Sequence, residues 1–124
     1  ERLARLAKEV GDVQSELQAW VELATLSSAS TKTVSKAANE VNRLLHENDS
    51  PVQGEESRIL LRSISEALKQ RSHELDADGF SRLAWIRLYI DDERGAIEAT
   101  KKGLEKEQNN KHCRRLAKRL EIEK

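Results

Sequence analysis

The chain has 124 residues, enough for one small domain or part of a repeat array. Hydrophobic residues make up 37% of it and charged residues 35%, a balance that fits thin layers of stacked helices better than one thick core. The 22 basic residues equal the 22 acidic ones, which excludes a global attraction to nucleic acid or an anionic membrane and leaves only local patches to provide one.

Hydrophobic residues recur every three or four positions, as they do on the buried face of an α-helix. No stretch shows the strict alternation of a half-buried strand. The helical stretches cover about residues 3–10, 13–24, 34–45, 60–75, 79–90, 96–104 and 113–120. The sequence therefore predicts an all-α fold of about seven helices.

Short polar segments separate these stretches, so successive helices should pack antiparallel. Ser30 or Thr31 is placed to cap the third helix, and Asp76 or Asp78 to cap the fifth. The pair Asn109–Asn110 is placed to break the chain and cap the seventh helix.

The fifth helix is apolar around nearly its whole circumference, which indicates that neighbouring helices bury it from several sides. It holds Phe80, Trp85 and Tyr89, three of the four aromatic residues of the chain. The sixth helix carries Ala96 and Gly103 on one face, and their small size lets another helix approach its backbone closely.

The segment from Leu83 to Leu104 resembles a tetratricopeptide (TPR) repeat, and the likeness is clearest over residues 78–121. Phe80 falls on the bulky site of that family's first helix, while Ala96 and Gly103 take the two small-residue sites of its second helix. Three positions depart from the family pattern: Arg87 stands for a Tyr, Thr100 for an aromatic residue and Gln108 for a Pro.

The resemblance implies antiparallel hairpins stacked as a right-handed superhelix, with a concave groove that binds a peptide or protein. The expected single domain spans 1–124, with hairpins at about 1–27, 31–75 and 78–107 and a terminal helix at about 110–122. The resemblance also implies that Arg82 and Arg87, on the first helix of the repeat, face the groove and bind an acidic group of the ligand. The alternative is that both pair with Asp or Glu of an adjoining helix, since buried arginines need a partner.

The seventh helix carries a basic stripe opposite its apolar face. The stripe consists of Lys111, Arg115, Lys118 and Arg119, with Arg114 beside them. It could contact nucleic-acid phosphates or an acidic partner. The alternative is the solvated outer face of a capping helix, whose cations offset the helix dipole.

The residue types of catalytic and metal sites do not gather in the sequence. His46, His73, His112 and Cys113 lack metal-ligand spacing, and the acid pairs stand at expected helix starts. The glycines form no phosphate loop. We therefore expect no enzyme, no cofactor and no metal, but a protein–protein interaction module. The alternatives are homodimerisation and nucleic-acid binding through the seventh helix.

The expected location is the cytoplasm, without membrane binding. No apolar stretch approaches the roughly 20 residues of a membrane span, and no signal peptide is visible. A single cysteine excludes an internal disulfide and favours a reducing compartment. Because the chain begins within a helical pattern and contains no Met, we expect it to be a piece of a larger protein.

Overall fold

The computed structural model describes residues 13–26, 28–47 and 54–121, and these form helices without any strand. The elements are α2 (Val13–Ala24), α3 (Thr31–Glu47), α4 (Gly54–Gln70), η1 (Ser72–Glu74), α5 (Ala77–Tyr89), α6 (Glu93–Lys106) and α7 (Lys111–Arg119). The predicted all-α class is therefore confirmed over the described ranges. The first expected helix, at 3–10, lies outside them.

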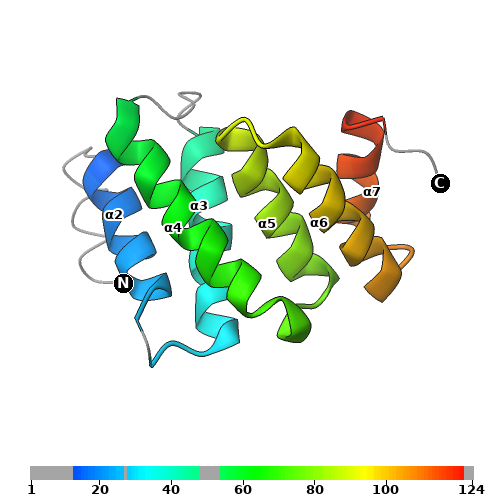
Figure 1. Cartoon of the computed structure of the whole chain (residues 1–124), viewed down its shortest axis with the longest axis horizontal. Coiled ribbons are helices and arrows are strands. Elements are labelled where there is room, and N and C mark those ends of the chain that lie inside the picture. The colour runs from blue at the N-terminus through cyan, green and yellow to red at the C-terminus, as the bar shows by residue number, and fades with distance from the viewer. Residues whose placement is uncertain (1–12, 27, 48–53, 122–124) are drawn as a thin grey trace.

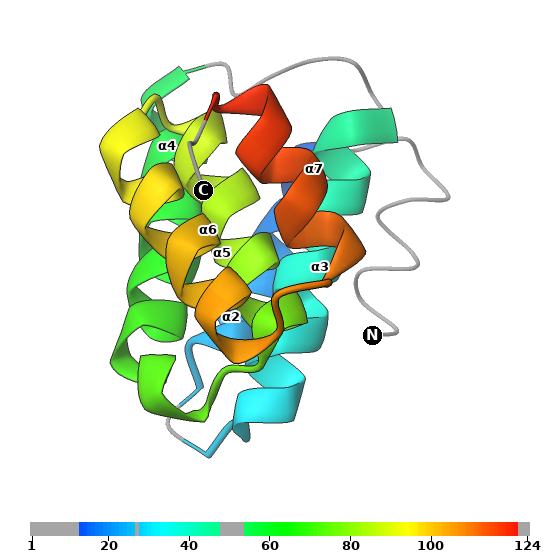
Figure 2. The same ribbon diagram turned by 90° about the vertical axis from the view of Figure 1, so that its right-hand side faces the viewer.

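Successive helices run in alternating directions and stand side by side along the molecule (Figure 1). The helix α5 lies at the centre of this stack, in contact with α3 and α4 on one side and with α6 and α7 on the other. Seen from the end, α4 and α6 lie on one side of α5, and α3 and α7 on the other (Figure 2). The closest pairs are α5 with α6 and α2 with α3, while α3 and α4 touch each other less.

Side-chain caps mark where the helices begin, because each satisfies a backbone N–H that has no partner inside the helix. Of the two candidates for α3, Ser30 accepts the N–H of Thr33 at 3.1 Å. Asp76 accepts the N–H of Gly79 at 2.8 Å, so α5 begins at Ala77, two residues before the predicted start. The Asn110 side chain caps α7 as expected, accepting from the N–H of Cys113 at 3.0 Å.

The helices α5, α6 and α7 pack closely where they meet around Gly103. A methyl group placed there would overlap Cys113 Sγ and lie 3.2 Å from Phe80 Cβ. The Cys113 thiol donates to the carbonyl of Ala77 at 3.4 Å, which ties α7 to the start of α5. Thr100, fully buried one turn away, donates to the carbonyl of Ala96 at 2.8 Å. The expected close helix approach is thus present at Gly103.

Replacing Gly103 by alanine is expected to lower the free energy of unfolding by about 1–2 kcal/mol. Overpacking a core costs about 1–3 kcal/mol, and the better helix propensity of alanine returns at most about 1 kcal/mol. Urea denaturation followed by circular dichroism measures the change.

The Cys113→Ala substitution provides a control, because it removes the sulfur that the new methyl group would meet. It should destabilise the Gly103→Ala protein less than it destabilises the wild type. Strictly additive effects would contradict this account of the junction.

Candidate functional site

A groove of about 290 Å³ opens between α3, α5 and α7, and we call it the α3–α5–α7 groove. Its lining consists of Asn39, Asn42, Arg43 and His46 from α3, Ser81, Arg82, Trp85 and Tyr89 from α5, and His112 from α7. Within α3 and α5 these positions recur every three or four residues, so each helix presents them on one face. None of the lining residues carries a carboxylate, although acidic and basic residues balance over the whole chain.

Two aromatic side chains form one wall of the groove. The rings of Trp85 and Tyr89 lie with their centroids 6.3 Å apart and their planes tilted by 34°. The guanidinium carbon of Arg119 lies 5.3 Å from the centroid of a Trp85 ring, within the range of a cation–π interaction. Burial raises the pKa of Tyr89, and the charge of Arg119 offsets part of that rise, so the phenol is neutral and able to donate.

Arg82 joins α5 to α3 at the edge of the groove. Its Nη1 donates to the Ser35 hydroxyl at 2.7 Å and to the Ser35 carbonyl at 3.3 Å. In return, Asn42 Nδ2 donates to the backbone carbonyl of Arg82 at 3.1 Å. The other amide atom, Asn42 Oδ1, is buried without a hydrogen-bond partner among the described residues. The Asn42 amide therefore joins α3 to α5 beneath the surface of the groove.

Arg43 brings a guanidinium to the groove whose charge is already matched. It pairs with Glu40 at 2.7 Å, Glu47 at 3.0 Å and the buried Glu16 of α2 at 3.8 Å. Hydrogen bonds to Glu40 and Glu47 raise the pKa of Arg43. We therefore assign Arg43 mainly to holding α2 against α3 rather than to attracting a ligand.

A second hollow, of about 620 Å³, continues the groove toward the start of α3. The two share Asn39 and Arg82 in their linings. Charges of both signs line this extension: Lys32 and Lys36, together with Glu74 and Asp76. The face formed by α3 and α5 is thus long enough for an extended segment, and the part of it next to α7 has no carboxylate in its lining.

The structure brings only some of the predicted site residues to this groove. Arg82 lines it, whereas Arg87 donates to the carbonyl of Gly95 at 2.9 Å and so braces the turn between α5 and α6. On α7, Arg119 lies over Trp85. The other predicted cations, Lys111, Arg115 and Lys118, are exposed along α7 outside the groove lining.

Sequence reasoning missed Asn42, His46, Trp85, Tyr89 and His112 as groove residues. The polar positions of α3 do recur on one side of its apolar stripe, which was an available signal. The two aromatic residues stand in a helix that is apolar around most of its circumference, so the sequence predicts them in the core. His112 shares a helix face with Arg119, two turns away, and that spacing was also available.

Catalytic and metal chemistry has little support in the described residues. No group of three or more His, Cys, Asp or Glu side chains gathers there to hold a metal ion. Cys113 is fully buried, and burial together with Asp78 and Glu107 raises the pKa of its thiol to about 11. The thiol is therefore neutral at ordinary pH and a poor nucleophile. None of the described helices combines the length and apolar character that crossing a membrane requires.

Comparison of the chain with protein-family models, with curated proteins and with solved structures finds no match. The function is therefore argued from the geometry and chemistry of the described residues alone.

Cys113 is expected to react with a thiol reagent at pH about 8 only as fast as the chain unfolds, because the folded thiol is buried and neutral.

The contribution of Cys113 to the free energy of unfolding should also fall at high pH. The folded pKa of about 11 lies above the ordinary value of 9.0, so the unfolded chain loses its proton first and stability falls between these values. Denaturation curves of the wild type and the Cys113→Ala variant, compared from neutral to alkaline pH, isolate this effect from other titrating groups. A rapid reaction of the native thiol would contradict the assignment.

Proposed function

We propose that this chain is a non-catalytic, TPR-like interaction module that binds an acidic segment of a partner protein in the α3–α5–α7 groove. The observation that carries the proposal is the composition of the lining. It combines Arg82, His46 and His112 with an aromatic wall and contains no carboxylate. In a chain with a net charge of zero, a lining that holds arginine side chains and no carboxylate favours an acidic ligand.

The groove offers each kind of contact that an extended peptide uses. Trp85 and Tyr89 provide rigid apolar area, and aromatic and arginine side chains dominate the energetics of many interfaces. Arg119 and His112 lie on one face of α7, two turns apart, and Arg119 offers a cation to a carboxylate of the ligand.

The arrangement of helices supports the TPR-like part of the proposal. Every second helix, α3, α5 and α7, contributes to the same groove, as the first helices of stacked TPR hairpins do. In this assignment α4 and α6 are the second helices of two hairpins, and α7 is the terminal helix. A stack of this kind builds a long concave surface from short local units.

The test is selection of binding peptides from a random library on the immobilised chain, followed by affinity measurement by fluorescence anisotropy. Selected peptides should be enriched in Asp and Glu, with an aromatic or aliphatic residue nearby. Arg119→Ala should weaken their binding by about tenfold or more, because it removes the cation that lies over the aromatic wall at Trp85.

The matched control is Lys118→Ala, which removes the neighbouring cation of the same helix, and the side chain of Lys118 points about 100° away around the helix axis. It should change the affinity by less than about twofold, as is usual for an exposed charge outside an interface. Selected peptides without acidic residues, or equal losses in the two variants, would contradict binding in the groove.

Nucleic-acid binding through α7 is the second candidate, because the cations of that helix are exposed. It predicts a different outcome for the same variants. Affinity for a labelled oligonucleotide should fall steeply with salt, and Lys118→Ala and Arg119→Ala should weaken it alike, since each removes one phosphate contact.

A further inference from the structure

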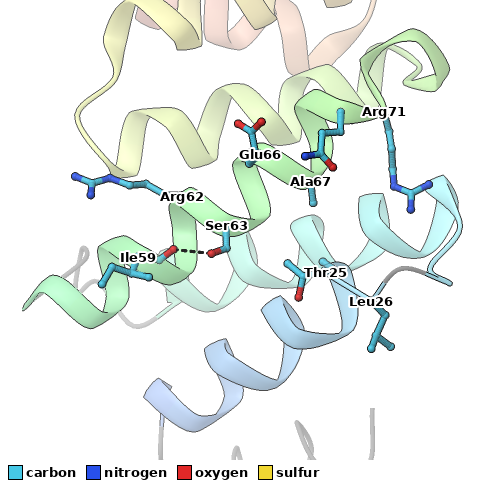
Figure 3. Close-up of a pocket in the computed structure, with 10 residues that line it drawn as sticks. Thr25, Leu26, Ile59, Arg62, Ser63, Glu66, Ala67 and Arg71 are labelled. Atoms are coloured by element: carbon cyan, nitrogen blue, oxygen red, sulfur yellow. Dashed lines mark hydrogen bonds between the residues drawn. The ribbon is translucent and has the colours of Figure 1, made fainter.

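A second groove, of about 740 Å³, lies between α2 and α4, on helices other than those of the proposed ligand site. We call it the α2–α4 groove, and Figure 3 shows its lining. It consists of Ala24, Thr25, Leu26, Ile59, Arg62, Ser63, Glu66, Ala67, Gln70 and Arg71. In the end-on view, α4 lies across the molecule from α3 and α7 (Figure 2), so the two grooves open on different sides.

The α2–α4 groove holds the two large hydrophobic side chains that the described residues leave exposed. Leu26 and Ile59 are each 52% exposed. Scattered exposed hydrophobic residues are common, but these two line one groove, where a single bound molecule could cover both. The two lie at opposite ends of the groove, Ile59 near the start of α4 and Leu26 below its last turns (Figure 3).

The charges of this groove are arranged for pairing with an identical surface. Arg62 and Glu66 stand one turn apart on α4, and both are exposed. The ion pair of Arg62 with Glu55 is long, at 3.7 Å, and both side chains are solvated, so it is easily exchanged. Arg71 is engaged elsewhere, since it donates to the carbonyl of Ala29 at 2.5 Å.

A two-fold axis passing midway between Arg62 and Glu66 along α4 would exchange the two ends of the groove. It would place Arg62 of one copy opposite Glu66 of the other, and Glu66 opposite Arg62. The same operation would bring Ile59 of each copy toward Leu26 of the other. One surface thus supplies both halves of each apolar and each charged contact, which is the requirement for a symmetric dimer.

We propose that the α2–α4 groove is a self-association surface through which two copies of this chain pair about a two-fold axis. This leaves the α3–α5–α7 groove of each copy open, so the dimer presents two ligand grooves and gains avidity for a repeated acidic partner. The dimer is weak, because ten residues line the groove against the roughly 20–30 per side of a standard interface.

Sedimentation velocity across micromolar to millimolar concentrations tests the proposal on the chain as it stands. The wild type should show a reversible monomer–dimer equilibrium. Arg62→Glu and Glu66→Arg should each weaken the dimer by about tenfold, because the symmetry places every like-charge contact in the interface twice. The double variant, with the charges exchanged, should restore the wild-type constant to within about twofold.

Ile59→Asp provides a second and stronger disruption, and it should leave the chain monomeric throughout the range. Because the altered side chains are exposed, thermal unfolding followed by circular dichroism should be nearly unchanged in all variants. A wild type that stays monomeric would overturn the proposal. So would a dimer that survives Ile59→Asp, or a double variant no better than the single ones. None of these outcomes bears on peptide binding at the other groove, which is measured separately.

Discussion

The enclosure of α5 is the constraint on which the rest of the described structure depends. A helix that is apolar around most of its circumference is stable only when other helices cover it on several sides. The helices α3 and α4 cover one side of α5, and α6 and α7 cover the other. Each covering helix needs only one apolar stripe, which explains why their outer faces can be so strongly charged. The close approach at Gly103 allows α6 and α7 to reach α5 together.

This enclosure also determines where a ligand can bind. Polar atoms of α5 can reach solvent only along the seams between its neighbours, and the seam between α3 and α7 is where Arg82 and Tyr89 emerge. The side chains of that seam are held by packing and by the hydrogen bonds of Arg82 to Ser35. A groove with this much preorganised lining loses little conformational entropy when a ligand binds.

The two proposed surfaces differ in the chemistry that each would recognise. The α3–α5–α7 groove has an aromatic wall and no carboxylate in its lining, so it suits an acidic ligand. The α2–α4 groove combines Arg62 and Glu66 with exposed Leu26 and Ile59, so it suits a copy of itself. Because the surfaces lie on different helices, self-association and ligand binding can occur together, and the effects of their variants should be separable.

The sequence by itself determined the all-α class and the existence of the helices α2 to α7, and it narrowed the caps of α3, α5 and α7 to two candidates each, because hydrophobic periodicity and capping are local properties. It did not determine the bounds of α4, which covers Gly54–Gln70 and not the expected 60–75. The tertiary structure decided which side chains share a groove. His46 and Trp85 come from helices far apart in the chain, and their meeting depends on how α3 rotates against α5. It also decided that Arg87 braces the turn before α6 rather than lining the groove. The hydrophobic periodicity of a helix specifies which of its faces is buried. Only the packing of the helices specifies which side chains of a neighbouring helix lie beside its polar face.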